Sequence, residues 1–384
     1  MQALPDAGPD RRCGTMRVLL VGAAPSIHMV RWANGLAERG HDVHLATAHR
    51  PGRHTFSRDV HLHLAPDLCA GRYLTDAWWL RRLADSVDPD IVNVHFATGY
   101  GLMARLAHIR QPTLLSVWGA DIYDTPRRNA AAARIVRDNL AAATRLASTS
   151  LCMADVIRHY AGRRPISITP FGVDTDEFVP SPRPEDGVVR VGTVKALFAK
   201  YGIDDLIRAF AVVREQRADQ GLELHLYGEG PDEGALRELA SGLDQSVIFH
   251  GAVPHEEVPK ALAGLDVFAA LSTLDSESFG VAILEAGACG LPVVVTDTDG
   301  PAEVVEQGRT GLIVPRRDVG AAAAALERLV DSSDLRRRMG QAGRHHVLAH
   351  YSWKLSLELM EQAYRDTIHD ASRSSERRGR HCGS

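Results

Sequence analysis

The sequence predicts an α/β protein with two doubly wound parallel-sheet domains and a ligand cleft between them. Short apolar runs alternate with amphipathic stretches along the chain, which is typical of parallel sheets covered by helices. The length of 384 residues suits two domains. A proline-rich break at 179–187 separates two such series. With 45% apolar and 24% charged residues, the composition excludes disordered, collagen-like and coiled-coil chains.

The first series begins with RVLLVG at 17–22, a compact apolar run that ends at glycine and predicts a buried strand. Helical spacing of apolar residues follows and ends at Gly40. Residues 41–47 then predict a second strand, which completes one βαβ unit. Four more strands are expected in this series: 90–96, 112–118, 144–149 and 165–170.

The second series repeats the alternation after the break, and the chain after Pro315 is expected to be helical, with the last helix at 352–368. Its expected strands are 188–194, 222–228, 246–251, 266–271, 292–296 and 311–315. The predicted organisation is a flexible leader (1–16), an N-terminal Rossmann-like domain (17–178), a linker (179–187), a C-terminal Rossmann-like domain (188–350), a helix that packs back across the domain junction (351–369) and a disordered tail (370–384).

The net charge and the cysteine pattern indicate which partners and which cellular location to expect. The chain has 44 Lys and Arg against 48 Asp and Glu, a net charge of −4, which argues against nucleic-acid binding. Its five cysteines are far apart and form no CxxC, so a reducing, cytoplasmic location is expected. Residues 127–143 hold four arginines among many alanines, a pattern that also allows peripheral contact with the inner face of a membrane.

The segment 272–290 (STLDSESFGVAILEAGACG) contains the most informative candidate ligand-binding residues of the sequence. We predict a helix that begins near Phe279 and ends near Gly290, and the N–H groups of its first turn would attract a phosphate without a metal. Gly280 would let that phosphate approach the backbone. Glu285 lies among apolar residues and needs hydrogen-bond partners such as sugar hydroxyls, and Glu277 could reach another part of the same ligand. The plainer interpretation is that Glu277 is an acidic residue at the N-terminus of the helix and that Glu285 is an acidic residue on the surface.

The stretch from Glu277 to Glu285 resembles the E-x7-E signature of the family 4 glycosyltransferases, retaining enzymes with the GT-B fold. The resemblance extends over about 17–365 and includes Gly228-Glu-Gly-Pro231, Phe249-His-Gly-Ala-Val253 and Gly300-Pro-Ala-Glu303. It implies two Rossmann-like domains facing each other across a cleft. It also implies metal-independent transfer, with retention, of a sugar from a nucleotide-diphosphate sugar to a hydroxyl acceptor, which would be a glycan, a lipid-linked sugar or a small metabolite. UDP and GDP are the expected nucleotides, and no cofactor is expected.

The resemblance also implies roles for single residues. Glu285 would bind the ribose hydroxyls and Glu277 the transferred sugar, while Lys195 and Lys200 would hold the diphosphate and stabilise its negative charge as it leaves. Lys195 stands near a position where the family usually has arginine, so it keeps the charge and loses the bidentate fork. The remaining residues implied to bind the donor in this domain are Ser278, Phe279, Gly280, Val281 and Gly228.

In the N-terminal half, the main candidates are Gly22, His28, Trp118 and Asp121, and His95 at the end of a predicted strand is a further acceptor-side candidate. Gly22 and His28 belong to a loop that resembles the family's glycine loop, although packing at a helix start is an equal interpretation of His28. Asp121 is a candidate catalytic residue after a predicted strand. Trp118 replaces a histidine that is usual in the family, and its indole would stack on a sugar or simply pack.

Other patterns receive a structural interpretation. The pairs Asp174-Thr-Asp176 and Asp297-Thr-Asp299 are interpreted as turn and cap acids, and no metal site is expected. The histidines at 61, 63, 345 and 346 are interpreted as lacking partners at ligand spacing. The main alternative function is a non-catalytic nucleotide-sugar-binding subunit of a glycan-assembly complex. A sugar phosphorylase and a dinucleotide oxidoreductase stay open, although the latter lacks a GxGxxG motif.

Overall fold

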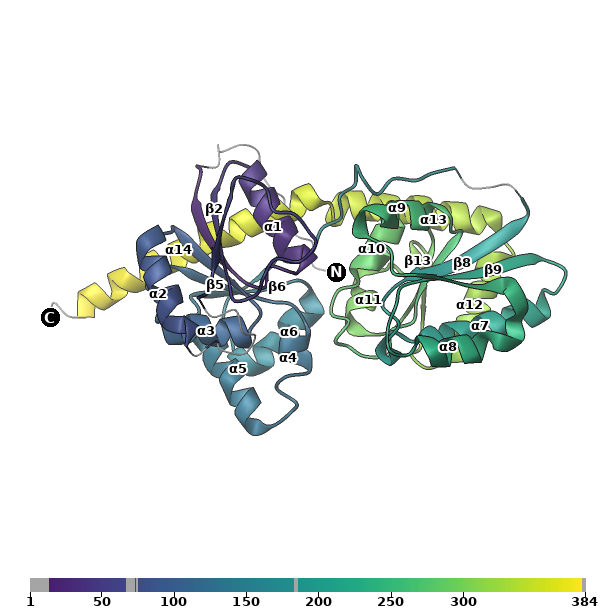
Figure 1. The fold of residues 1–384 in the computed structure, drawn as a ribbon, viewed down its shortest axis with the longest axis horizontal. Helices are drawn as coiled ribbons and strands as arrows, with labels where there is room; N and C mark the ends of the chain where they lie inside the picture. Colours follow the sequence, from purple (N-terminus) through teal and green to yellow (C-terminus); the bar gives the residue numbers. More distant parts are fainter. Residues whose placement is uncertain (1–13, 67–72, 74, 183–185, 382–384) are drawn as a thin grey trace. The chain divides into compact units, whose positions relative to one another are not determined.

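The computed structural model of the chain describes residues 14–66, 73, 75–182 and 186–381. These residues form two compact units, shown in Figure 1. The first unit holds the described residues up to Leu115, residues 142–144 and those from Asp366 onward; the second holds 116–141 and the described residues of 145–365. The predicted domain boundaries and the packing of the 351–369 helix stay predictions, and most of the predicted leader lies outside the described residues.

A seven-stranded sheet has the order β3-β2-β1-β4-β5-β6-β7. Its pairs β1–β2, β1–β4, β2–β3 and β6–β7 are parallel. The strands are β1 (Arg17–Val21), β2 (Asp42–Thr47), β3 (Val60–Leu64), β4 (Ile91–His95), β5 (Thr113–Val117), β6 (Arg145–Ser148) and β7 (Ile166–Ile168). Six of the seven match predicted strands. The edge strand β3 was not predicted.

A six-stranded sheet in the second unit has the order β10-β9-β8-β11-β12-β13, and all of its neighbours pair in parallel. Its strands are β8 (Val188–Val194), β9 (Gly221–Tyr227), β10 (Val247–Gly251), β11 (Val267–Ala270), β12 (Val293–Thr296) and β13 (Gly311–Val314). All six were predicted. The order extends in both directions from the central β8–β11 pair, as in doubly wound sheets.

Helices connect most of the consecutive strands, as is usual in parallel sheets, whereas a loop without a helix joins β2 to β3. The helices are α1 (Ile27–Glu38), α2 (Asp76–Val87), α3 (Gly99–Ala107), α4 (Ala120–Tyr123), α5 (Ala130–Ala142), α6 (Leu151–Ala161), α7 (Ile203–Gln216), α8 (Glu233–Ala240), α9 (Val258–Ala263), α10 (Val281–Ala288), α11 (Asp299–Val304), α12 (Val319–Val330), α13 (Ser333–His350) and α14 (Trp353–His381). Because α14 continues to His381, the prediction of a disordered tail from residue 370 is wrong as far as that residue. Among the described residues, no helix has both the length and the apolar character needed to cross a membrane.

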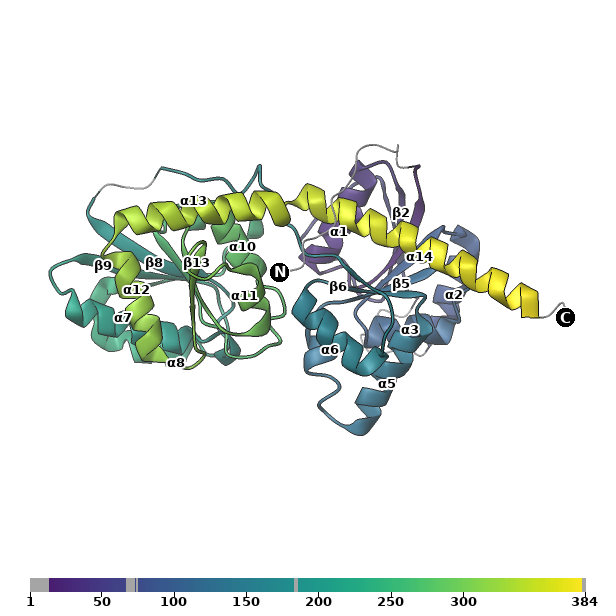
Figure 2. The same cartoon turned by 180° about the vertical axis from the view of Figure 1, so that it is seen from behind.

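The six-stranded sheet is covered on both faces. Helices α7, α8 and α12 lie on one face and α9, α10 and α13 on the other, as both views show (Figures 1 and 2). Leu224 of β9, Phe210 of α7 and Leu329 of α12 have no exposed surface and belong to one apolar core. This packed core fixes the strands, so that the loops at their carboxyl ends start from rigid positions.

Candidate functional site

Three loops of the second unit meet at the carboxyl ends of the six-stranded sheet. The segment after β8 is bound to the loop after β9, because Lys195 N donates to Tyr227 O at 2.9 Å and Leu197 N donates to Glu229 O at 3.0 Å. The segment after β11 joins them, because Thr273 N donates to Lys200 O at 2.8 Å. This is the edge at which doubly wound sheets bind ligands.

Glycines allow these loops to approach one another closely. Gly228 has φ 148°, and a Cβ built on it would lie 2.0 Å from Lys195 O. Gly202 has φ 62°, and a Cβ there would lie 1.9 Å from Leu271 O. Any larger residue would push the loops apart and would also strain the backbone. Gly228 therefore shapes the loop that carries Lys195.

A partly buried ion pair joins two of the predicted residues. Lys195 Nζ lies 2.8 Å from Glu277 Oε2, and the two side chains are 18% and 14% exposed. Burial lowers the pKa of Lys195, but Glu277, Tyr201 and Glu285 outweigh burial, and the pKa is raised above its ordinary value. Lys195 is therefore a charged ammonium at neutral pH, with both predicted glutamates acting on its charge.

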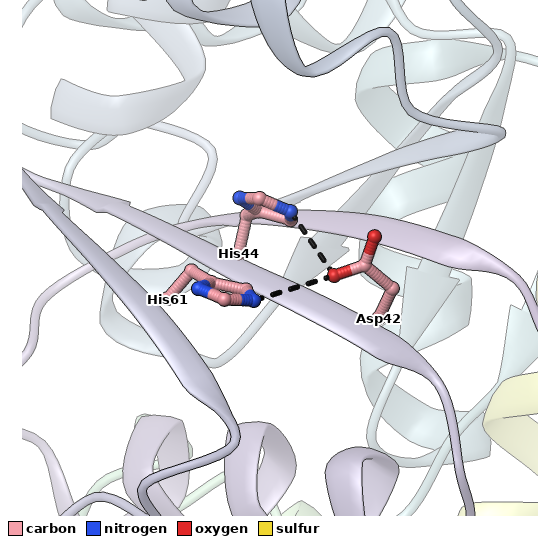
Figure 3. Close-up of side chains that lie close together, drawn as sticks. All are labelled: Asp42, His44 and His61. Carbon is pink, nitrogen blue, oxygen red and sulfur yellow. Dashed lines mark ion pairs between the residues drawn. The ribbon is translucent and has the colours of Figure 1, made fainter.

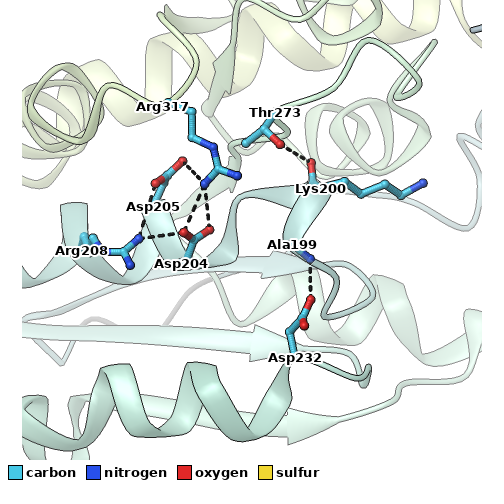
Figure 4. Close-up of polar contacts among 8 residues, drawn as sticks. All are labelled: Ala199, Lys200, Asp204, Asp205, Arg208, Asp232, Thr273 and Arg317. Atoms are coloured by element: carbon cyan, nitrogen blue, oxygen red, sulfur yellow. Dashed lines mark hydrogen bonds and ion pairs between the residues drawn. The ribbon is translucent and has the colours of Figure 1, made fainter. Parts of the chain in front are cut away.

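Lys200 lies in a 3-10 turn (Ala199–Tyr201) whose backbone is fixed from two sides, as Figure 4 shows. Thr273 donates to Lys200 O through its backbone N–H and its hydroxyl, at 2.8 and 3.2 Å. Asp232 accepts from Ala199 N at 2.6 Å. The side chain of Lys200 extends away from the other labelled side chains (Figure 4).

The ring of Tyr201, which the sequence analysis did not single out, is close to both lysines. The Nζ atoms of Lys195 and Lys200 are 4.6 and 4.8 Å from the centroid of its ring. Cations at that range are attracted to the aromatic face. The ring therefore helps to hold two positive charges beside one another, despite their mutual repulsion.

Helix α10 begins after Gly280, which is its N-cap residue with φ 86°, and ends before Cys289. The predicted helix was thus correct in type and about two residues too long at each end. Glu285 on this helix is 7% exposed, and Phe279 is 3% exposed. The ring of Phe279 packs edge-on against Phe171 and Tyr351, with centroids 6.1 and 5.8 Å away. Aromatic packing therefore fixes the segment just ahead of the helix.

Ser278, Trp118 and Asp121 are tied together through the backbone. Ser278 Oγ donates to Trp118 O at 2.9 Å. One carboxylate oxygen of the fully buried Asp121 accepts from Trp118 N and Gly119 N, at 3.2 and 2.8 Å. The Trp118 ring packs edge-on against Phe171 at 5.4 Å. Asp121 therefore shapes a turn, and its predicted catalytic role and the sugar contact of Trp118 stay predictions.

Gly22 and His28 belong to the first unit. Gly22 follows β1, where a Cβ would lie 2.2 Å from Met29 Cε, so the glycine is needed for close packing of α1. His28 is the second residue of α1 and is partly exposed. Their predicted roles in the site stay predictions.

The Asp-x-Asp pairs take part in local structure. Asp174 Oδ1 accepts from the backbone N–H groups of Asp176 and Glu177, at 3.0 and 3.2 Å, as expected of a turn acid. Asp297 Oδ1 accepts from the backbone N–H of Arg316 at 2.9 Å. Asp299 is the first residue of α11.

The interpretation of His61 as lacking partners at ligand spacing is wrong. Strand β3 places His61 Nε2 3.6 Å from Asp42 Oδ1, and His44 Nε2 lies 3.2 Å from the same oxygen. His63 Nε2 lies 2.9 Å from His44 Nδ1. The alternation V-H-L-H-L at 60–64 was the available signal, because it places both histidines on one face of a strand.

Two family models match the chain. The model described as "Glycosyl transferase 4-like" matches residues 17–150, and the model described as "Glycosyl transferases group 1" matches residues 174–346. Together they cover most of both halves of the chain, including every candidate residue discussed above.

Curated relatives match about half of the chain. A GDP-mannose-dependent alpha-(1-6)-phosphatidylinositol monomannoside mannosyltransferase of Mycolicibacterium smegmatis is 36% identical over 201 residues, which are 48% of this chain and 52% of the relative. A D-inositol 3-phosphate glycosyltransferase of Arthrobacter sp. is 33% identical over 240 residues, 59% of this chain and 56% of the relative. The match thus spans little more than half the length of either relative.

Solved structures share the fold over nearly the whole chain. Sucrose-phosphate synthase from Thermosynechococcus elongatus has a TM-score of 0.79 at 20% identity, covering 92% of this chain and 99% of that one. Anabaena HepE in complex with UDP has a TM-score of 0.76 at 16% identity, covering 91% of this chain and 100% of that one. These likenesses confirm the predicted GT-B class of fold, with two parallel-sheet α/β domains.

Proposed function

Because the chain belongs to the family 4 glycosyltransferases, we propose that it transfers a sugar, with retention, from a nucleotide-diphosphate sugar to a hydroxyl acceptor. The observation that carries this proposal is the partly buried Lys195–Glu277 pair, 2.8 Å apart, at the carboxyl ends of the six-stranded sheet. A positively charged lysine at this edge suits the negative charge of a diphosphate leaving group.

The proposed mechanism assigns the positive charges to the departing diphosphate. When the sugar–phosphate bond breaks, negative charge grows on the diphosphate oxygens. The ammonium groups of Lys195 and Lys200 and the first turn of α10 would stabilise that charge. These groups are held by loop contacts before the donor arrives, so little reorganisation is needed. We propose for this reason that transfer needs no added divalent ion.

The two glutamates would bind the sugar parts of the donor. Glu285 is nearly buried on α10 and would accept hydrogen bonds from the ribose hydroxyls. Glu277 would bind hydroxyls of the transferred sugar, while its pairing with Lys195 keeps its carboxylate in place.

GDP-mannose is the first donor to test, because that nucleotide sugar appears in the name of the mannosyltransferase relative. UDP-sugars are the second choice, because HepE was solved with UDP. The relatives' names suggest two acceptors, inositol phosphate and a phosphatidylinositol mannoside. The latter is a lipid, and its use would bring the chain to a membrane surface.

The direct test is a donor panel of UDP-, GDP-, ADP- and dTDP-sugars, scored first by thermal shift and then by sugar transfer in EDTA. One donor should raise the melting temperature, and Lys200→Ala should lower its turnover about 100-fold or more. Lys354→Ala is the matched control, because Lys354 is exposed at the start of α14. Donor binding without transfer to any acceptor would instead favour a non-catalytic nucleotide-sugar-binding subunit.

A further inference from the structure

The register of two edge strands gathers three side chains with metal-binding atoms in the first unit. Strands β2 and β3 are parallel, and His44 pairs with His61. Asp42 lies two residues before His44 on β2, so its side chain is on the same face of the sheet. Because β3 is the outermost strand, the three side chains lie at the edge of the sheet.

The three ligand atoms converge on one point, as Figure 3 shows. Asp42 Oδ1 lies 3.2 Å from His44 Nε2 and 3.6 Å from His61 Nε2. One ligand atom from each residue lies within 4.8 Å of the other two. A tetrahedral zinc ion, with bonds of about 2.0–2.2 Å, separates its ligand atoms by roughly 3.4 Å. Small side-chain rotations would therefore complete the coordination.

Neighbouring groups orient two of the ligands. Arg17 Nε donates to Asp42 Oδ2 at 2.7 Å, which leaves Oδ1 directed at the two imidazoles. His44 Nδ1 lies 2.9 Å from His63 Nε2. When His44 Nδ1 donates to His63, the lone pair of His44 Nε2 faces Asp42 Oδ1. Two acceptors then face each other, and a cation between them would satisfy both. Such outer contacts are usual around metal-bound histidines.

The cluster is open to ions from solvent. The side chains of His61, Asp42 and His44 are 59%, 39% and 15% exposed. The three ligands of a bound ion would thus differ in burial: His44 is the least exposed, and His61, whose ring stacks on that of His44 with centroids 4.6 Å apart, is the most exposed. An open position remains for a water molecule.

We propose that Asp42, His44 and His61 form a binding site for a divalent transition ion, with Zn²⁺ as the best match. Two imidazole nitrogens, one carboxylate oxygen and one water make a four-coordinate set that suits zinc. His63 is a positioning residue that acts through His44. The bound ion would fasten the edge strand β3 to β2, so its effect is on the stability of the first unit rather than on sugar transfer.

The test is a calorimetric titration of zinc chloride into the full chain, without a polyhistidine tag and after removal of metals. The wild type should bind one equivalent. His44→Ala and His61→Ala should each weaken binding about 100-fold, and His63→Ala about 10-fold, the range seen for outer-contact residues. His225→Ala is the matched control, because His225 in the second unit also contacts a carboxylate and a second histidine.

A second measurement guards against loss of folding. His61 is exposed, so its alanine variant should keep the wild-type circular dichroism spectrum and melting temperature in EDTA. Zinc chloride should then raise the melting temperature of the wild type and not that of His61→Ala. Wild-type affinity in a folded His61→Ala chain, an equal loss in His225→Ala, or no binding by the wild type would each overturn the proposal.

Discussion

The outer strands of both sheets carry a row of one carboxylate and two histidines. On β2 and β3, Asp42 Oδ1 lies 3.2 Å from His44 Nε2, and His44 Nδ1 lies 2.9 Å from His63 Nε2. The central imidazole thus contacts the acid through one nitrogen and the second imidazole through the other. Such a row cannot bind one ion with all three members, because the outer two lie on opposite sides of the central ring.

The row on β9 and β10 has the same form. Glu223 Oε2 lies 3.0 Å from His225 Nε2, and His225 Nδ1 lies 3.0 Å from His250 Nε2. The difference is the residue in register with the central histidine. On β3 it is His61, whose Nε2 faces the acid, and on β10 it is Ile248. The side chain at this one position of the edge strand therefore decides whether three ligand atoms converge, as on β3, or only a row of contacts forms, as on β10.

In the six-stranded sheet, the candidate donor-binding residues lie instead at the ends of the strands. There the charged groups are partly or largely buried, and glycines bring the loops together, whereas the cluster on β2 and β3 lies on an open face. The comparison predicts two properties, sugar transfer and zinc binding, that single substitutions should separate.

The largest effect is expected at the strand ends. Lys195→Ala should lower kcat about 10²- to 10³-fold, because it removes a preformed positive charge from the leaving diphosphate. Lys195→Arg should keep much of the activity, since it keeps the charge. Zinc affinity should not change in either variant. Steady-state transfer assays and the zinc titration check the prediction, and equal loss in Lys354→Ala would refute it.

The next largest effect is expected when β3 receives the residue that β10 has at the equivalent position. His61→Ile should lower zinc affinity about 100-fold, because it removes one of three ligands. The rate of sugar transfer should stay at the wild-type value. A fall in kcat in the folded variant would show that the two properties are not separate.

A smaller effect is expected from Glu285→Ala. Hydrogen bonds to a charged group contribute about 1.5–3 kcal/mol, so the affinity for the nucleotide should fall about 10- to 100-fold. Calorimetry with GDP and UDP measures this loss. Unchanged affinity would remove Glu285 from the ribose contact.

The smallest effect is a gain. Ile248→His, introduced into His61→Ile, places an imidazole in register with His225 and should improve zinc affinity about tenfold over the parent variant. The gain should stay below the wild-type value, because the β10 register is irregular between Phe249 and Gly251. No gain at all would mean that register alone does not make the site.

The sequence was sufficient to predict most of the regular parts of the fold. Short runs rich in apolar residues, alternating with helical stretches, identified twelve of the thirteen strands that the structure describes. The short alternation of apolar residues and histidines in β3 was not interpreted as a strand, and with it the histidine cluster was missed. The helix to His381 was missed because its last residues are polar throughout.

Contacts between segments that are distant in the sequence could not be predicted from the sequence. The resemblance identified Lys195 and Glu277 separately, but their ion pair depends on the meeting of the segments after β8 and β11. The position of Tyr201 close to two lysines likewise depends on the 3-10 turn. For Asp121, the pattern suggested chemistry, whereas the observed carboxylate accepts from two backbone N–H groups.

The most direct test of the central claim is a calorimetric titration of GDP and UDP into the wild type and Lys195→Ala, with EDTA present throughout. If ammonium groups and a helix start bind the diphosphate, one nucleotide should bind the wild type in EDTA, and the variant should bind it at least about tenfold more weakly. Equal affinity in the two proteins, or wild-type binding that appears only after Mg²⁺ is restored, would contradict it.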